Sequence, residues 1–190
     1  MNLTEILRQR RSYYVLNRNL PVSEKDLLEK IEGYTELVPD AFDMKSSRIV
    51  VALGDKQDDL WNAIFEAFGG KVKRDKIAGF QAGAGTVLYF YDTEVISQMQ
   101  GQFPRLSENF PLWALQASGM LQFTIWNGLR ELGIGASLQH YNPVIDDAVK
   151  KLFGLPASWK LIAQMPFGGI GAEPEPKDKE DISNRVWIRK

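Results

Sequence analysis

The sequence contains no cysteine and only one histidine, His140. Disulfides, thiolate metal sites and a cysteine nucleophile are therefore excluded. One histidine cannot build a multi-histidine metal centre within the chain, and a serine–histidine triad would have to use His140. No G-x-S-x-G nucleophile elbow accompanies it. We therefore expect no metal site, and for His140 taken alone we favour a local structural role over a ligand role.

The chain also lacks net charge and long apolar runs. Its 23 basic and 24 acidic residues give a net charge of −1, which argues against general nucleic-acid binding, since that needs a broad basic face. The N-terminus carries Glu5 where a signal peptide needs apolar residues. The longest apolar stretch, residues 77–91, contains Gln81 and glycines and is too short to span a bilayer. With the absence of cysteine, these features predict a soluble cytoplasmic protein with neither nucleic acid nor membrane as a partner.

What remains is a 190-residue chain with 44% apolar residues, enough for one domain with a sizeable core. Apolar periodicity predicts strands over residues 48–53, 85–91, 134–138, 159–165 and 185–189. Helices are predicted over residues 2–10, 23–37, 55–68, 95–100, 107–132 and 142–153. This alternation favours an α+β or α/β layered domain.

The longest predicted helix, residues 107–132, is apolar around most of its circumference. Its small residues Ala114, Ala117, Ser118 and Gly119 would let another helix approach closely. Either a central position within one domain or a place shared between the core and a subunit interface explains this pattern.

The densest group of donors lies near the N-terminus, where Arg10, Arg11 and Ser12 end a short helix. Planar guanidinium groups bind phosphate and carboxylate with paired hydrogen bonds, and a serine hydroxyl adds a further donor. The alternative is an ordinary helix C-terminus, where cations are favoured anyway. The late basic residues Lys177 and Lys179 either belong to a charged tail or reach back to these arginines.

Other motifs are less specific. Residues 133–143, GIGASLQHYNP, combine glycines that allow close approach of a flat ligand with polar side chains, or form a strand edge before a helix cap. The glycine-rich residues 80–86 precede a strand and lack a following lysine, so they indicate a turn rather than a nucleotide loop. The basic run over 71–76 is typical of a solvated face. Asp146 and Asp147 are adjacent, which suits a helix N-terminus better than acid–base chemistry.

Taken together, these pieces resemble the FMN-dependent nitroreductase family over nearly the whole chain. Arg10-Arg11-Ser12 matches the motif that ends the family's first helix. The more specific blocks resemble the compact branch of fatty-acid-repression nitroreductase-like proteins: VPDAFDMKSSRIVVALG (38–54), AGAGTVLYFYD (82–92), the long block over 108–143, and the terminal NRVWI. The resemblance implies one FMN-binding domain over 1–190 with an α+β layered fold. A central, mostly antiparallel sheet is then flanked by helices, and two chains form an intertwined homodimer with FMN at the interface and the tail strand crossing to the partner.

Carried over position by position, the resemblance implies three groups of cofactor-binding residues. The opening motif binds the FMN phosphate and ribityl oxygens through Arg10, Arg11 and Ser12. A loop reaching FMN from the partner subunit contributes Ala41, Phe42, Asp43 and Lys45. The segment beside the isoalloxazine ring comprises Leu138, Gln139 and His140, with a backbone N–H near Gln139 or His140 facing flavin N5.

Some positions match less closely. Tyr14 stands where relatives often have a basic residue near the flavin, and Asp43 and Lys45 differ from the usual Ser-Ala-Phe-Asn-Ser-Gln loop. Lys177 and Lys179 approximate the late basic residues that complete the phosphate site. The expected walls of the substrate pocket are Phe42, Phe110 and Trp113, although core packing explains Trp113 equally well.

The resemblance implies an oxidoreductase that takes a hydride from NAD(P)H onto flavin N5 and reduces nitroaromatics or quinones by ping-pong kinetics. The cofactor carries this chemistry, so no side chain is expected to act as a strong acid or base. Two alternatives remain at this point: a flavin-binding regulatory or sequestering protein with little turnover, and an interaction domain whose arginines bind an acidic partner.

Overall fold

The computed structural model describes residues 2–178 and 180–190, and an antiparallel β-sheet forms its centre. Three long strands make up most of the sheet: β2 (Ser47–Leu53), β3 (Gly85–Asp92) and β5 (Trp159–Ile170). The short β1 (Leu16–Asn17) extends it in the order β1-β5-β3-β2, and β4 (Gly135–Ala136) also pairs with β5. Every one of these strand pairs is antiparallel, while an isolated bridge between Ser12 and Ala136 is parallel. The prediction of a mostly antiparallel sheet flanked by helices is confirmed.

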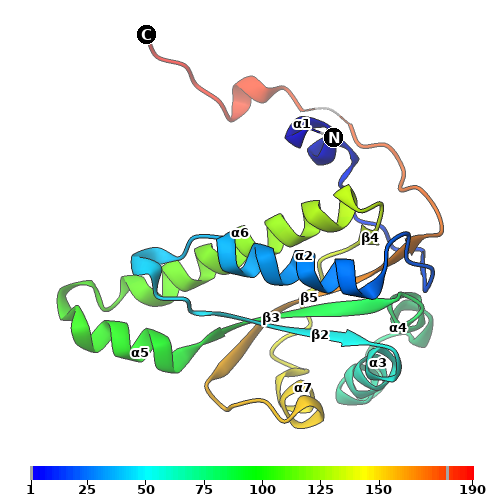
Figure 1. The fold of residues 1–190 in the computed structure, drawn as a ribbon, viewed down its shortest axis with the longest axis horizontal. Coiled ribbons are helices and arrows are strands. Elements are labelled where there is room, and N and C mark those ends of the chain that lie inside the picture. The colour runs from blue at the N-terminus through cyan, green and yellow to red at the C-terminus, as the bar shows by residue number, and fades with distance from the viewer. Residues whose placement is uncertain (1, 179) are drawn as a thin grey trace.

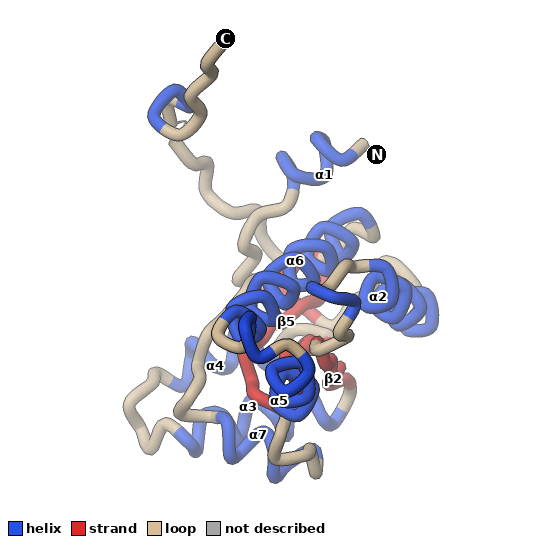
Figure 2. Tube along the Cα trace, turned by 90° about the vertical axis from the view of Figure 1, so that its left-hand side faces the viewer, coloured by secondary structure: helices blue, strands red, loops and turns tan. Residues whose placement is uncertain are grey.

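Helices cover both faces of this sheet. They are α1 (Leu3–Gln9), α2 (Glu24–Leu37), α3 (Asp55–Ala67), α4 (Arg74–Gln81), α5 (Thr93–Gln102), α6 (Asn109–Glu131) and α7 (Asp146–Phe153). Figures 1 and 2 show α2 and α6 on one face, and α3, α4 and α7 on the other. Among the described residues, none of the helices combines the length and the apolar character needed to cross a membrane.

The alternating side chains of β3 build the two halves of the core. Val87 and Tyr89 pack with Leu121 and other residues of α2 and α6, whereas Leu88 and Phe90 pack against α3, α4 and α7. All eight residues of β3 are buried, as expected for a central strand covered on both faces. The strand therefore fixes α6 and α3 on opposite sides of one sheet.

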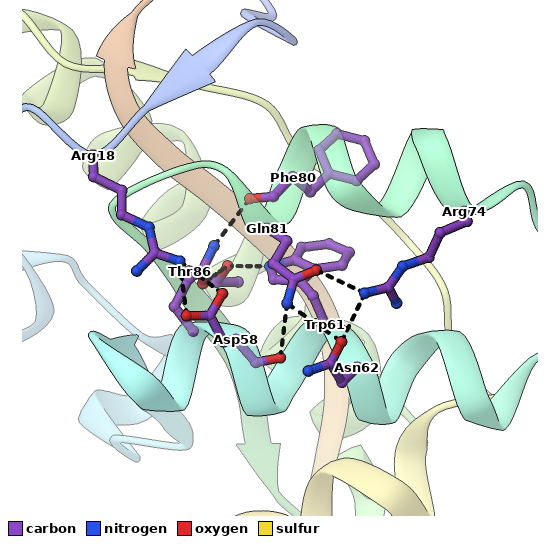
Figure 3. Close-up of polar contacts among 9 residues, drawn as sticks. Arg18, Asp58, Trp61, Asn62, Arg74, Phe80, Gln81 and Thr86 are labelled. Carbon is purple, nitrogen blue, oxygen red and sulfur yellow. Dashed lines mark hydrogen bonds and ion pairs between the residues drawn. The ribbon is translucent and has the colours of Figure 1, made fainter.

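A buried polar network joins α3 to β3 (Figure 3). The Trp61 indole N–H donates to the Thr86 hydroxyl at 2.9 Å, and that hydroxyl donates to the Gln57 side-chain carbonyl at 2.7 Å. The Gln57 amide then donates to the Phe80 carbonyl at the end of α4, at 2.9 Å. These three side chains are fully buried, and each donor has its acceptor, so the network stabilises the packing of α3 and α4 on the sheet.

Local residue chemistry explains several helix ends, and the helix N-terminus expected at Asp146 and Asp147 is confirmed. The Ser23 hydroxyl accepts from the Asp26 backbone N–H at the start of α2, and Asp146 and Asp147 lie in the first turn of α7. Gly154 ends α7 with a left-handed φ of 62°, a conformation that favours glycine. Gly83 lies in the turn into β3, where a Cβ would come within 2.6 Å of the Phe167 carbonyl oxygen.

Other boundaries differ from the prediction. Residues 74–81 form a helix that the basic composition and the nearby glycines did not indicate. β5 continues to Ile170 because its last residues pair with β1 and β4, whereas the strand predicted over 134–138 is limited to β4. The strand predicted over 185–189 does not form within the described chain, because a strand needs a neighbouring backbone to pair with. That segment is exposed and follows a 3₁₀ turn at Ile182–Asn184.

Candidate anion and aromatic half-sites

The first half-site is centred on Arg10 and Arg11. The Arg10 guanidinium lies 4.3 Å from the centre of the Trp126 ring on α6, and an Arg11 terminal N–H donates to the Glu175 carbonyl. The Nε atoms of both arginines are buried, and neither has a hydrogen-bond partner among the described residues. Burial, together with the adjacent Arg11 charge, lowers the pKa of Arg10. Two such cations side by side are costly unless an anion offsets them.

Ser12 and the segment after α6 come together at this half-site. Ser12 bridges to Ala136, and the Tyr13 N–H donates to the Ala136 carbonyl at 3.0 Å. The Trp126 indole N–H donates to the same carbonyl at 3.3 Å. Glycine at position 135 allows this close packing, because a Cβ there would lie 2.9–3.2 Å from side chains of Ile170, Tyr13 and Leu16. The structure thus brings the opening motif beside Ala136, two residues before the segment 138–140 of the predicted site.

In the segment after Ala136, Gln139 pairs with the sheet, whereas His140 lies at the surface. Gln139 exchanges both backbone hydrogen bonds with Gln164, at 2.7 and 3.0 Å, so its N–H is already used. The Tyr141 N–H donates to the Gln164 side chain at 2.9 Å. His140 is exposed, and its N–H has no partner among the described residues. Of the two backbone groups that the sequence left as alternatives, His140 is the one that can still donate to a ligand.

Tyr14 and Lys177 lie at the margins of the half-site. Tyr14 is 57% exposed, and its ring lies 6.5 Å from that of Phe80 on α4. Lys177 is exposed and lies two residues beyond Glu175, whose carbonyl contacts Arg11. The structure therefore brings the C-terminal segment to the arginines without a direct contact from the Lys177 side chain. Lys179 lies outside the described residues.

Lys76 is exposed, as expected for the solvated basic run over 71–76. Its ammonium group also lies 5.5 Å from the centre of the Tyr141 ring, next to His140, which the sequence did not indicate. The Tyr141 hydroxyl is buried and has no partner within the described part of the chain. Only the fold reveals this neighbourhood, because α4 was not predicted as a helix.

The second half-site is the loop over residues 40–45, at the other end of α6 (Figure 1, the light-blue segment after α2). The Phe42 ring lies 4.9, 5.6 and 5.7 Å from the rings of Phe103, Phe110 and Trp113. Phe110 is fully buried, whereas Phe42 is 53% exposed. The three predicted wall residues are therefore together, and Phe103 joins them. Phe103 was missed because an isolated aromatic before Pro104 carries no periodic signal.

Asp43 and Lys45 lie at the surface of the same loop, with 3.5 Å between carboxylate and ammonium. Phe42, Asp43 and Lys45 all have positive φ angles, 57°, 50° and 53°. Such angles are rare for residues with bulky side chains and often occur at ligand sites. Within one chain, this loop and the arginines do not meet. Trp113 and Trp126 are thirteen residues apart on α6, which corresponds to about 20 Å along a helix.

The donor set of the first half-site fits a phosphorylated cofactor. Two arginines with unpaired, buried Nε–H groups offer directed positive charge, and the backbone N–H of the exposed residue His140 offers a donor four residues beyond Ala136. Phosphate oxygens are the acceptors that paired guanidinium groups prefer. The exposed rings of the second half-site suit a flat, apolar molecule.

The comparisons with known proteins point to one family. The model of the Nitroreductase family matches residues 7–169. Nitroreductase FRM2 of Saccharomyces cerevisiae is 30% identical over 190 residues, 98% of this chain and 96% of the relative. The putative nitroreductase HBN1 of the same yeast is also 30% identical, over 96% of this chain and 94% of the relative.

Solved structures show the same fold. Nitroreductase CinD from Lactococcus lactis, in complex with chloramphenicol, is 38% identical with a TM-score of 0.95, and each chain is covered completely. A nitroreductase-fold protein from Exiguobacterium sibiricum in complex with FMN shares the fold at a TM-score of 0.77, with 14% identity, over 100% of this chain and 98% of that chain. The chain belongs to the nitroreductase family, and its FRM2-like relatives place it in the branch that its sequence resembles.

Proposed function

We propose that this protein is an FMN-dependent oxidoreductase that uses NAD(P)H to reduce nitroaromatics, quinones or both by a ping-pong reaction. The observation that carries the proposal is the pair of buried, unpaired Arg10 and Arg11 Nε groups beside Ala136. CinD, 38% identical, has been solved with chloramphenicol and with 4-nitrophenol, both nitroaromatic compounds. Their ring chemistry matches the exposed aromatic half-site.

Different groups of residues in the chain would bind different parts of FMN. Arg10, Arg11 and Ser12 would bind the phosphate and ribityl oxygens, with Lys177 and Lys179 completing this charge. Leu138, Gln139 and His140 would lie beside the isoalloxazine ring, with the His140 N–H as donor. When bound, FMN supplies the hydride acceptor and donor. The protein supplies orientation, positive charge and a flat apolar surface, so it needs no strong acid or base.

We further propose that the two half-sites meet across a homodimer interface formed by α6. Leu112, Leu115, Met120 and Phe123 form a stripe on its outer face, each 43–57% exposed. Gly119 lies in this stripe, and a Cβ there would contact nothing. An exposed apolar stripe of this kind indicates an interface.

The position of the stripe explains how one site forms from two chains. Gly119 and Met120 lie midway between Trp113 and Trp126 along α6. If two copies pack antiparallel about a two-fold axis at this point, the Trp113 end of one helix lies beside the Trp126 end of the other. The loop with Ala41, Phe42, Asp43 and Lys45 would then face the arginines of the partner.

The C-terminal tail offers a second contact between the copies. Val186, Trp187 and Ile188 are 54–74% exposed and lie among basic residues. A groove of about 820 Å³ runs between α2, the edge strand β2 and α6, with Ile31, Val51 and Leu121 among its apolar lining and Glu32, Glu36 and Asp43 among its acidic residues. Because an edge strand has unpaired backbone groups, we propose that the tail of a second copy fills this groove.

Turnover with an electron acceptor tests the proposed reaction. Purified protein reconstituted with FMN is mixed with NADH or NADPH, first alone and then with 4-nitrophenol, chloramphenicol or menadione. Acceptor-dependent oxidation of the nicotinamide, with parallel lines in double-reciprocal plots, is expected. Flavin binding without acceptor-dependent turnover would instead identify a regulatory or sequestering flavoprotein.

A further inference from the structure

The loop that carries Phe42 holds an unusual backbone, and one carboxylate closes it. Asp40 accepts three hydrogen bonds: from the Ala41 N–H at 2.8 Å, and from the Ser46 N–H and hydroxyl, each at 2.7 Å. Ser46 is fully buried. These bonds join the first and last residues of a segment that includes three left-handed residues.

The far end of this loop is anchored to the sheet. The Ser46 carbonyl accepts from the Asp92 N–H at 2.8 Å. Arg48 donates to the Lys45 carbonyl at 2.7 Å and to the Asp92 carboxylate at 3.0 Å. The Ser46 end of the loop is therefore held by β3. Because the Asp40 carboxylate binds both Ser46 and the Ala41 N–H, the residues before Phe42 are held as well.

Left-handed φ angles at Phe42, Asp43 and Lys45 cost energy, and they persist only where the surroundings hold them. The rings of Phe103, Phe110 and Trp113 lie 4.9, 5.6 and 5.7 Å from the Phe42 ring, yet Phe42 as a residue is 53% exposed. Packing alone therefore leaves the exposed face of the ring free to turn with its loop. The Asp43 and Met44 N–H groups donate to the Asp40 and Ala41 carbonyls at 3.0 and 3.1 Å within the turn. The Asp40 carboxylate adds the side-chain bonds that join the two ends of the loop, on both sides of Phe42.

We infer that Asp40 is a positioning residue that fixes the Phe42 ring as the stacking surface for aromatic electron acceptors. It does so without touching the acceptor, through the hydrogen bonds to Ala41 and Ser46. This inference rests on the proposed function. It assigns acceptor selectivity to a residue outside the predicted cofactor and substrate positions, and it distinguishes aromatic acceptors from small inorganic ones.

The experiment compares 4-nitrophenol with ferricyanide, which accepts electrons without stacking. The variants are Asp40→Ala, Asp40→Asn, Ser46→Ala, Phe42→Leu and the double variant Asp40→Ala/Phe42→Leu. Asp40→Ala is expected to lower the ratio of kcat/KM for 4-nitrophenol to that for ferricyanide about fivefold, mainly through KM, which is the size of one aromatic contact. Asp40→Asn keeps an oxygen for the Ala41 N–H, and Ser46→Ala loses only the hydroxyl, so both should show smaller effects.

The double variant separates positioning from general damage. If Asp40 acts through Phe42, adding Asp40→Ala to Phe42→Leu lowers the ratio no further. Ser23→Ala, which removes a helix cap far from the loop, is the control for lost stability, and it should leave the ratio at the wild-type value. An unchanged ratio in Asp40→Ala, or additive losses in the double variant, would overturn the inference.

A binding measurement keeps the inference independent of turnover. Calorimetric titration of the FMN-loaded protein with 4-nitrophenol should show weaker binding to Asp40→Ala than to the wild type. If Asp40→Ala does not fold, Ser46→Ala replaces it in this test and should also bind more weakly. Weaker binding without any turnover in the wild type would sink the proposed reaction but support the role of Asp40. Equal binding to wild type and variants, or none to either, contradicts that role.

Discussion

The Arg10 guanidinium stacks on the Trp126 indole at 4.3 Å, and the indole N–H donates to Ala136. One tryptophan of α6 thus fixes both a cation of the N-terminal motif and the segment that precedes His140. The Arg10 Nε–H has no partner among the described residues. The stacked guanidinium can therefore still donate a hydrogen bond to a ligand.

Arg10→Ala should weaken FMN binding about ten- to hundredfold, the loss expected for a charge-assisted hydrogen bond. Fluorescence titration of the apoprotein with FMN measures this change. Arg8→Ala is the matched control, since Arg8 is an exposed arginine of the same helix. Equal affinities for the two variants would show that the phosphate binds elsewhere.

The homodimer proposal predicts the effect of a charge at the centre of the α6 stripe. In Met120→Asp, two carboxylates would face each other near the two-fold axis, and the dimer Kd should rise at least about a hundredfold. Light scattering coupled to gel filtration reports the mass, and the visible absorbance of the flavin reports the FMN retained. Both should fall together.

Gln98→Asp adds the same charge at an exposed position of α5 and should leave the dimer intact. A dimeric Met120→Asp that keeps its FMN would rule out α6 as the shared interface.

Removing the Thr86 hydroxyl from the buried network should lower the stability of the protein without changing its fold. Thr86→Val leaves the Trp61 N–H and the Gln57 carbonyl without their partner (Figure 3). The free energy of unfolding should fall by about 2–4 kcal/mol, since each unsatisfied buried group costs about 1–3 kcal/mol. Urea denaturation measures it. Ser97→Ala, which removes an exposed hydroxyl bond on α5, should change stability by under about 0.5 kcal/mol.

Replacing Asp146 with asparagine should stabilise the protein in a pH-dependent way. Burial raises the pKa of its carboxyl, and the Oδ1 atom has no partner among the described residues. The folded state therefore holds this proton more tightly than the unfolded state, so the wild type loses stability as the pH rises through the raised pKa. Asp146→Asn escapes this loss, and its advantage in Tm should grow above the ordinary value of 3.8 and disappear below it.

Thermal denaturation of the wild type and of Asp146→Asn, at a series of pH values from below 3.8 to neutral, measures the difference in Tm. Asp147→Asn, at the exposed neighbouring position, should show no comparable gain at neutral pH. A constant difference between Asp146→Asn and the wild type at all pH values would mean that titration of this carboxyl is not responsible.

Much of the fold could be predicted from local pattern. The long strands and α6 are visible in their apolar periodicity. Ser23 marks a helix start by its capping hydroxyl, and Gly154 marks a helix end because a residue without a Cβ adopts the left-handed conformation easily. α4 was not predicted because Gly79 and the surrounding charges weaken the helical signal. Its stability depends on tertiary contacts, namely the packing of Ile77 and Phe80 in the core and the hydrogen bond from Gln57 to the Phe80 carbonyl.

The candidate site was accessible from the sequence only in part. Arg10, Arg11 and Ser12 signal an anion by residue type, and family resemblance supplied the loop over 40–45. The contacts of Lys76 with Tyr141 and of Phe103 with Phe42 join distant segments, which no spacing in the sequence encodes. Asp40 was missed because its importance lies in three hydrogen bonds to backbone and serine groups, made possible by the left-handed turns between them.

The decisive measurement is the visible absorbance spectrum of the purified chain during an anaerobic titration with NADH or NADPH, followed by 4-nitrophenol. We predict a yellow protein with FMN equimolar to the chains, bleached by the nicotinamide and coloured again by the acceptor. A chain that folds but takes up no FMN at saturating concentration, or bound FMN that neither nicotinamide reduces, would contradict the proposed function.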